Sequence, residues 1–198
     1  IEYFRSDLPA RERLKYLPEF KWLVDEWPSA KGLKELSDEI EAEQFALSEI
    51  MAYINSLETD HAKARKGKFI QQILQPELVL HSDKQAIQHI IVNLLTNAFK
   101  FCQTGTVTLE IRPSGEKDLY IAVSDDGIGM DQQHLEKIFQ PFFQISHGTT
   151  RKFGGSGLGL SIVKKIIGEM NGKILVESQI GQGSKFEVFL PQVIHQEE

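Results

Sequence analysis

The feature that most constrains the fold is a pair of alternating apolar runs lying between two amphipathic helical stretches. Val107, Leu109 and Ile111 lie at alternate positions, as do Leu119, Ile121 and Val123, which is typical of β-strands. Residues 84–101 and 158–170 instead repeat their apolar side chains at helical spacing. The expected strands follow one another as hairpins and are mixed with helices, whereas strands and helices would alternate strictly in a β-α-β fold. The sequence therefore predicts an α+β protein built on a layered sheet.

The rest of the chain divides into shorter expected elements. Residues 1–31 contain three prolines, so any helix there is short. Residues 33–64 have apolar side chains at helical spacing, as one long helix or as two helices joined near 42–45. The remaining expected elements are strands at 68–74 and 77–81, a short helix at 131–138, a glycine-rich loop at 144–157, and a closing hairpin with strands at 173–178 and 185–190.

Composition and charge exclude several classes of protein. The net charge of −6 argues against a nucleic-acid or membrane partner, and no apolar run approaches the roughly 20 residues that cross a bilayer. Cys102 is the only cysteine, which excludes an intrachain disulfide and fits a reducing compartment such as the cytoplasm. The sequence has no signal peptide, and because it begins at Ile1 we expect a fragment of a longer protein, either anchored in a membrane or not.

Three polar residues interrupt the apolar pattern of the helix expected at 84–101. Asn93, Asn97 and Lys100 fall within an arc of roughly 60° when the residues are drawn at about 100° intervals. Taken alone, the trio is best explained as the solvated flank of an amphipathic helix. Amide oxygens also suit Mg²⁺, however, and a lysine suits a phosphate. The apolar stripe beside the trio, which we expect to face the core, consists of Ile87, Ile91, Leu94, Leu95 and Ala98.

A second motif, VSDDGIGM at 123–130, ends an expected strand with two aspartates and two glycines. Gly127 and Gly129 permit positive φ and a close approach of the backbone to a ligand. Asp125, just past the strand, could accept a hydrogen bond from an exocyclic amine. A common Asp-Gly turn is the favoured interpretation of this motif when it is taken alone.

A third motif, FGGSGLGLSIV at 153–163, places four glycines directly before a helix. Backbone amides and the helix dipole make such a loop a phosphate site. No Gly-Lys-Ser/Thr follows, so it is not a Walker A loop, and a glycine run of this type is a weak signal by itself.

The three motifs and a fourth segment, Phe-x-Pro-Phe at 139–142, resemble in their order along the chain the N, G1, F and G2 boxes of the sensor histidine kinase catalytic domain. The matching residues are Asn-x-x-x-Asn-Ala-x-Lys-Phe, Asp-x-Gly-x-Gly, Phe-x-Pro-Phe and Gly-x-Gly-Leu-Gly-Leu. The resemblance covers roughly residues 45–191. It implies a two-layer α/β sandwich of the Bergerat type, in which helices cover one face of a mixed, mostly antiparallel sheet. It also implies a catalytic domain at 43–198, with 1–42 as an extension or the remnant of an upstream helical region.

The resemblance implies a role for each matching residue. Asn93, Asn97 and Lys100 are implied as catalytic residues that bind ATP, with Mg²⁺ on Asn97 and a phosphate on Lys100. Asp125 is implied to accept a hydrogen bond from the adenine amino group. The other residues implied around the nucleotide are Phe101, Gly127, Ile128, Gly129, Met130 and Ser184 near the base, and Phe142, Lys152, Gly155, Ser156, Gly157, Leu158, Gly159 and Leu160 near the lid and the phosphates.

The phosphate acceptor in such kinases is a histidine on a dimeric helical domain, and phosphate then passes to a response regulator. None of the six histidines has the usual acceptor signature, although His61 comes closest. We therefore expect the acceptor to lie outside this sequence. The superfamily's hydrolases have a water-activating glutamate at the position of Asn93, so hydrolysis by this domain should be slow. The rival interpretations are an anti-sigma-type serine kinase and a degenerate, non-catalytic sensor module of the same superfamily.

The loop at about 144–156 is expected to form a lid. It has little apolar surface to bury, so its conformational entropy is poorly compensated without a ligand. We expect the lid to be mobile without nucleotide and to be ordered by ATP more than by ADP.

Overall fold

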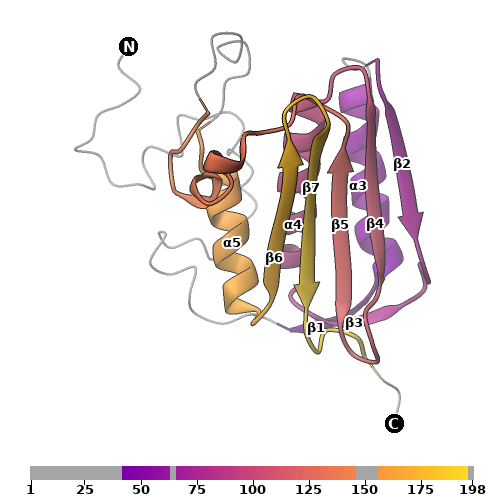
Figure 1. Cartoon of the computed structure of the whole chain (residues 1–198). Coiled ribbons are helices and arrows are strands. Elements are labelled where there is room, and N and C mark those ends of the chain that lie inside the picture. Colours follow the sequence, from indigo (N-terminus) through magenta and orange to yellow (C-terminus); the bar gives the residue numbers. More distant parts are fainter. Residues whose placement is uncertain (1–41, 63–65, 146–155, 196–198) are drawn as a thin grey trace, which may run out of the picture. The chain divides into compact units, whose positions relative to one another are not determined.

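The computed structural model describes residues 42–62, 66–145 and 156–195, all within one compact unit, Glu41–Glu198 (Figure 1). Its centre is a five-stranded sheet with the strand order β2-β4-β5-β7-β6. The pair β2–β4 is parallel, and the other three pairs are antiparallel. The strands are β2 (Lys68–Ile73), β4 (Thr106–Pro113), β5 (Leu119–Asp125), β6 (Lys173–Gln179) and β7 (Gly183–Leu190).

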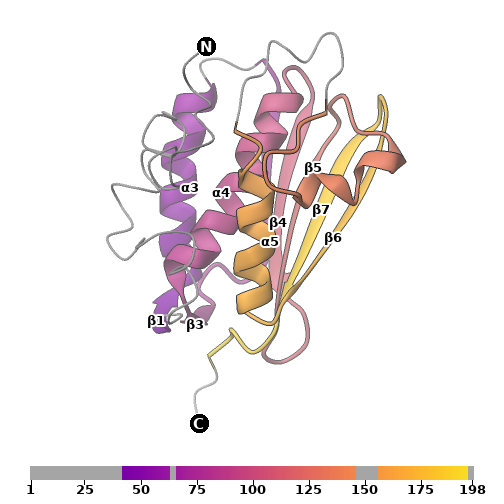
Figure 2. The ribbon, with the colours of Figure 1, turned by 90° about the vertical axis from the view of Figure 1, so that its left-hand side faces the viewer.

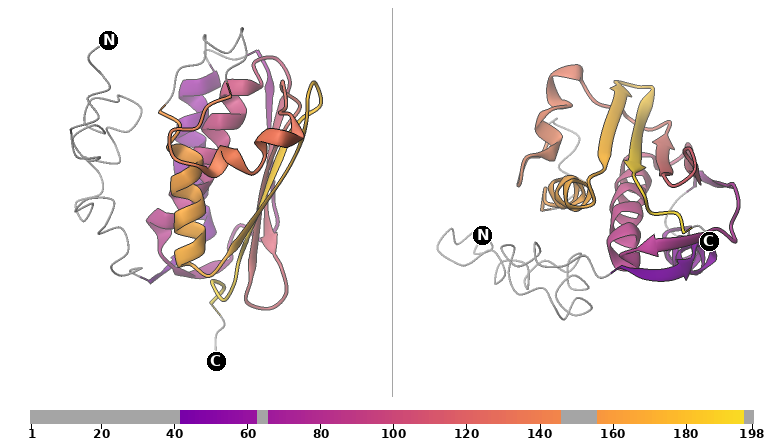
Figure 3. Two further views of the ribbon diagram at one scale, coloured as in Figure 1. Left: turned by 60° about the vertical axis from the view of Figure 1, so that its left-hand side comes forward. Right: turned by 90° about the horizontal axis from the view of Figure 1, so that it is seen from below.

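Three helices cover one face of this sheet, as Figures 2 and 3 show from the side. They are α3 (Leu47–Ala62), α4 (Lys84–Phe101) and α5 (Gly159–Glu169). The alternating residues Val107, Leu109 and Ile111 of β4 are fully buried on that face. This arrangement confirms the expected two-layer α+β fold with a mostly antiparallel sheet. No helix in the described ranges combines the length and the apolar character needed to cross a membrane.

Helix α4 lies at the centre of the helical layer, where it contacts α3, α5, β4 and β5. It begins after Asp83, whose carboxylate accepts a hydrogen bond from the Ala86 N–H at 2.8 Å and caps the helix. The predicted apolar stripe of α4 is buried throughout, so its orientation against the core is confirmed. Because the apolar stripe of α4 faces the core, the other sides of the helix are available for its polar residues.

Of the two alternatives for residues 33–64, one long helix is wrong, because the chain is not helical at residues 43–46, where the other alternative allowed a break. These residues form strand β1 (Glu43–Ala46), which pairs antiparallel with β3 (Val79–Ser82) in a second, two-stranded sheet. The Ala46 N–H donates to the Glu49 carboxylate at 3.0 Å, and the Leu47 N–H donates to the Leu78 carbonyl at 2.9 Å. The first N–H groups of a helix have no acceptor within the helix. Here the Glu49 carboxylate and the Leu78 carbonyl accept from the N–H groups of Ala46 and Leu47, so the helix begins at Leu47. Residues 33–41 lie outside the described part of the chain.

The short helix expected at 131–138 is present only in divided form. The segment forms two single 3-10 turns, Gln132–His134 and Lys137–Phe139. The Asp131 carboxylate accepts from the Gln133 N–H at 2.9 Å and starts the first turn. Ile138 is the only buried side chain in either turn, so the segment has no apolar stripe that would stabilise a longer helix.

Candidate functional site

The first part of the site is the polar side of α4 where it faces the start of α5. Asn93 is buried, and its Nδ2 donates to the His89 carbonyl at 2.9 Å, which directs Oδ1 away from its own helix. A Cβ atom placed on Gly159 would lie only 2.8 Å from Oδ1 of Asn93. The asparagine of the N box therefore lies directly against the glycine that begins α5, and no larger residue fits at that glycine without moving the amide.

Asn97 and Lys100 continue the same side of α4 toward its carboxyl end. Both are partly exposed, and within the described ranges the Asn97 amide makes no hydrogen bond to protein. The Lys100 Nζ lies 5.1 Å from the centre of the Phe101 ring, which keeps the ammonium near the end of the helix. An amide oxygen and an ammonium are thus presented together beside Asn93.

Asp125 ends β5, and its side chain is half-buried. Its Oδ1 accepts a hydrogen bond from the Gly127 N–H at 2.9 Å. Burial, together with the neighbouring charge of Asp126, raises the pKa of this carboxyl to about 6, although hydrogen bonds from the backbone of Gly127 and Ser184 act in the opposite direction. A desolvated carboxylate of this kind is a strong acceptor for a ligand N–H.

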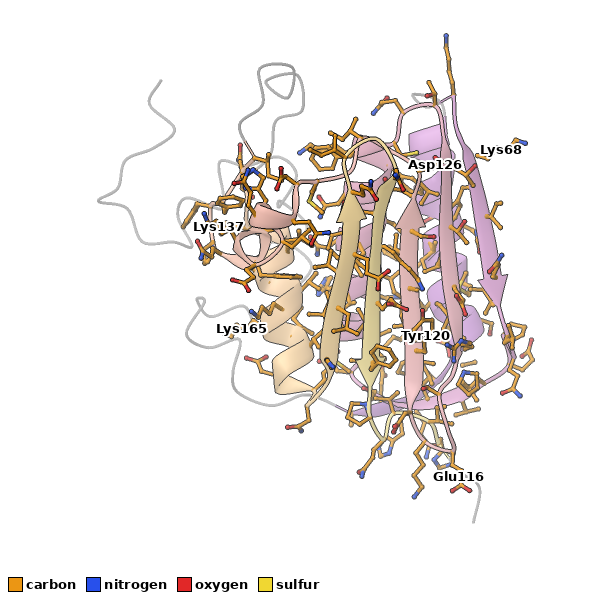
Figure 4. All side chains as sticks on the ribbon, in the orientation of Figure 1. Lys68, Glu116, Tyr120, Asp126, Lys137 and Lys165 are labelled. Carbon is orange, nitrogen blue, oxygen red and sulfur yellow. The ribbon has the colours of Figure 1, made fainter. Side chains whose placement is uncertain are left out.

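Asp126 has a different task, although it is adjacent in the sequence. Its Oδ1 accepts hydrogen bonds from the Thr106 N–H and, at 3.2 Å, from the Cys102 thiol, so it joins the end of α4 to the start of β4. Burial raises the pKa of the Asp126 carboxyl, but these hydrogen bonds outweigh the effect and lower it overall. Figure 4 shows Asp126 and Tyr120 toward opposite ends of β5, so the site lies at the end of the sheet where β5 stops.

The loop after Asp125 lies so close to the neighbouring backbone that its two glycine positions have no room for a side chain. A Cβ atom on Gly127 would lie 2.5 Å from the Phe101 carbonyl oxygen, and one on Gly129, whose φ is +63°, would clash with the Gln179 carbonyl. Ile128 is joined on both sides, donating its N–H to the Phe101 carbonyl at 3.3 Å and accepting from the Gly181 N–H at 2.8 Å. The G1 glycines therefore bring α4, this loop and the β6–β7 turn together.

The β6–β7 hairpin supplies a polar wall to this loop. Ser184 is the direct cross-strand partner of Asp125. Its Oγ lies 2.9 Å from Oγ of Ser178, which also accepts from the Met130 N–H at 2.8 Å. Ser178 was not found from the sequence. The sequence did contain an indication of it, because Ser178 continues the alternate, inward-facing positions of Ile174 and Val176 on β6.

The F box and the end of the glycine loop meet at a backbone hydrogen bond. The Phe142 N–H donates to the Gly157 carbonyl at 2.9 Å, and both residues have positive φ, +65° and +72°. Buried Ser156 accepts from the Leu158 N–H through its Oγ at 3.2 Å, just before α5 begins. Leu158 is buried and Leu160 is partly exposed. The expectations for Lys152, Gly155 and most of the lid fall on residues 146–155, outside the described residues, and stay predictions.

The chemistry of these donors fits a nucleotide with a hard cation. No group of three or more histidine, cysteine, aspartate or glutamate side chains that could hold a metal occurs in the described residues. The amide oxygens of Asn93 and Asn97 on α4 are neutral oxygen donors of the kind that suits Mg²⁺. The opposite end of the site is the acceptor Asp125.

Residues 82–194 match the family model described as histidine kinase-, DNA gyrase B- and HSP90-like ATPase. The chain belongs to this family. The resemblance inferred from the four boxes is thereby confirmed. Among similar proteins is the sensor histidine kinase RcsC of Escherichia coli strain K12, with 38% identity over 154 residues, which cover 77% of this chain and 16% of RcsC. The circadian input-output histidine kinase CikA of Synechococcus elongatus is 36% identical over 159 residues, covering 77% of this chain and 21% of CikA.

Solved structures support the same fold. The catalytic domain of histidine kinase ThkA, in a nucleotide-free form, is similar with a TM-score of 0.66 and 26% identity, over 77% of this chain and 97% of that domain. Full-length ShkA in complex with AMPPNP is similar in fold, with a TM-score of 0.70 and 24% identity, over 81% of this chain and 33% of ShkA. The chain thus spans only about a sixth to a fifth of the curated relatives named above, but almost all of the ThkA catalytic domain.

Proposed function

We propose that this chain is the ATP-binding catalytic domain of a sensor histidine kinase, which transfers the γ-phosphate of ATP to a histidine on a separate dimerisation domain. The observation that carries the proposal is the contact between Asn93 and Gly159. It brings the polar side of α4 against the start of α5, where backbone amides favour an anion. Asp125, at the end of the neighbouring strand, offers an acceptor for a base. One ligand with a base and a phosphate chain fits both ends.

The adenine end of the site depends on the ionised form of Asp125. Its carboxylate would accept a hydrogen bond from the adenine amino group, and Gly127 and Ser184 hold it through their backbone. A guanine base has a carbonyl at that position and would face the carboxylate unfavourably. We therefore propose that the site prefers ATP over GTP.

The phosphate end of the site rests on charge neutralisation rather than on a protein base. Asn97, with Asn93 beside it, would hold Mg²⁺, which supplies positive charge to the phosphates when it is bound. Lys100 would add its ammonium to the same phosphates. An amide at Asn93 cannot take a proton from water, so the domain holds ATP for transfer and hydrolyses it slowly.

The partners of the domain follow from the same proposal. Curated relatives are named as a sensor histidine kinase, a hybrid signal transduction histidine kinase and a sensor kinase/phosphatase. We propose that the whole protein is a homodimer through its histidine-bearing domain, that a response regulator receiver domain takes the phosphate, and that this part of the protein works in the cytoplasm. We propose no nucleic-acid or membrane contact for it.

A binding experiment followed by a transfer experiment tests the proposal. We expect calorimetry on the 198-residue chain to show ATP binding that is tighter with Mg²⁺ than with a chelator, and weak GTP binding. We then expect labelled ATP to produce acid-labile phosphohistidine on a supplied dimerisation domain. Asn97→Ala should lose the Mg²⁺ dependence and the transfer while adenosine binding largely survives. Asn55→Ala, an asparagine on α3 joined to Gln71, is the matched control and should behave as the wild type.

Each negative result has a different meaning. A chain that binds no ATP with or without Mg²⁺ contradicts the nucleotide site itself. A chain that binds ATP with Mg²⁺ but transfers no phosphate to any supplied histidine domain is the non-catalytic module. Wild-type transfer by Asn97→Ala would make Asn97 no more than a solvated residue on the side of α4.

A further inference from the structure

Ser178 is in an unusual position for a polar residue. It lies on β6, an edge strand of the sheet, and it is the only buried residue of that strand, with 8% of its surface exposed. A hydroxyl is costly to bury unless its hydrogen bonds are satisfied. Its hydrogen bonds therefore show what the residue does.

The Ser178 hydroxyl has three partners, and their chemistry fixes the direction of every proton. The Gly183 carbonyl oxygen, 2.8 Å away, can only accept, so the Ser178 proton points to it. The Met130 N–H, 2.8 Å away, can only donate. The third partner is Oγ of Ser184 at 2.9 Å. Because Ser178 has already used its single proton, the Ser184 hydroxyl must be the donor in this contact.

The consequence appears at Ser184. Its proton is directed to Ser178, so the rest of its hydroxyl presents lone pairs only. Ser184 is the direct cross-strand partner of Asp125, and side chains of such a pair lie on the same face of the sheet. The close packing of the hairpin on this strand is evident from Gly183, where a Cβ atom would clash with the Asp125 backbone. Two groups that can only accept hydrogen bonds thus lie side by side.

We propose that Ser178 is a positioning residue that sets base specificity by holding the Ser184 hydroxyl as an acceptor beside Asp125. The inference rests on the proposed nucleotide site and deepens it. A base that presents an amino group to this pair, directly or through a water, is accepted. A base that presents a carbonyl there is rejected by both residues. Without Ser178, the Ser184 hydroxyl is free to rotate and to donate to that carbonyl.

The experiment compares ATP with inosine triphosphate, which differs in having a carbonyl in place of the amino group. Calorimetry on the 198-residue chain gives the ratio of the two dissociation constants. We expect Ser178→Ala to lower the preference for ATP by about tenfold, the effect of one directed hydrogen bond. We expect Ser178→Thr, which keeps the hydroxyl, to retain the wild-type ratio. Ser82→Ala is the control, because Ser82 is a buried serine on β3 and should leave the ratio unchanged.

A double-variant cycle separates this role from a general loss of structure. If Ser178 acts through Ser184, then Ser184→Ala alone lowers the ratio by a similar factor, and adding Ser178→Ala lowers it little further. An unchanged ratio in Ser184→Ala overturns the inference even where Ser178→Ala fails to fold. An unchanged ratio in folded Ser178→Ala overturns it directly. If the wild-type chain binds neither nucleotide, the proposed function fails first, which is a distinguishable result.

Discussion

Asp125 combines two properties that are in conflict in the free protein. Its carboxylate must be ionised to accept a hydrogen bond from a base, yet its burial favours the protonated form. The hydrogen bonds from the backbone of Gly127 and Ser184 offset part of this effect and leave the pKa at about 6. The neighbouring Asp126 does not share the conflict, because its carboxylate is satisfied by Thr106 and Cys102. One residue of the pair thus has a desolvated carboxylate, and the carboxylate of the other is satisfied within the fold.

The first prediction at this scale concerns pH. Because the pKa of Asp125 is about 6, its acceptor form is complete above pH 7 and declines below pH 6. We expect the affinity for adenosine to fall by up to about tenfold per pH unit below pH 6. Adenosine is the correct probe, because the phosphates of ATP titrate in the same range. Adenosine binding that stays constant from pH 7.5 to pH 5, measured by calorimetry, would exclude Asp125 as the acceptor.

At the scale of elements, the two glycines at the ends of α5 have opposite roles. Gly168, near the end of the helix, has nothing within 4 Å of the position of a Cβ atom. Gly159, at its start, has the Asn93 amide 2.8 Å from that position. The far end of a side chain can move aside at little cost, so an alanine at Gly159 would displace the amide rather than unfold the helix.

This contrast predicts two different effects of the same substitution in one helix. Gly168→Ala should raise the free energy of unfolding by about 0.5–1 kcal/mol, because alanine favours helix, and should leave nucleotide binding unchanged. Gly159→Ala should change stability little but weaken binding of ATP with Mg²⁺ by about tenfold or more, since the Asn93 amide moves. Thermal unfolding and calorimetry measure the two effects. Equal nucleotide affinity in both variants would mean that Asn93 does not contact the ligand complex.

At the scale of the whole molecule, the site reduces the stability of the unit that contains it. A carboxyl whose pKa is raised on folding binds its proton more tightly in the folded protein than in the unfolded chain. The contribution of Asp125 to stability is therefore neutral below about pH 3 and becomes unfavourable as the pH rises through 6. A bound ligand that satisfies the carboxylate returns this stability.

Removing the charge should separate stability from function. We expect Asp125→Asn at pH 7.5 to stabilise the free protein by on the order of 1–3 kcal/mol, or about 2–4 °C in Tm per kcal/mol. The gain should shrink as the pH falls from 6 and vanish at about pH 3, below the ordinary pKa of 3.8, where the wild-type carboxyl is protonated in both states. ATP with Mg²⁺ at about 100 times the wild-type Kd should raise the free energy of unfolding of the wild type by about 2.7 kcal/mol. The same ligand concentration should stabilise the variant by much less, because the variant binds ATP more weakly. A variant that is less stable than the wild type when free would contradict the desolvation of Asp125.

The sequence alone determined those parts of the protein that depend on local periodicity and local chemistry. The stripe of α4 and the alternation of β4 are both expressed within a few residues, so they were predictable. The order of the four boxes identified the family, because each box contributes a short segment with its own chemistry. The polar trio on α4 was placed correctly on the helix for the same reason.

Only the tertiary structure decided the features that depend on partners distant in the sequence. Strand β1 replaced a helical continuation because the Leu47 N–H is satisfied by Leu78 and because β3 pairs with it. The different tasks of Asp125 and Asp126 arise from burial and from contacts with Cys102 and Thr106. Ser178 gained its role from Met130 and Gly183, which approach it only after the hairpin has packed on the loop. Periodicity reports which face of an element is buried, but the partner that satisfies each buried hydrogen bond is chosen by the packing of the whole domain.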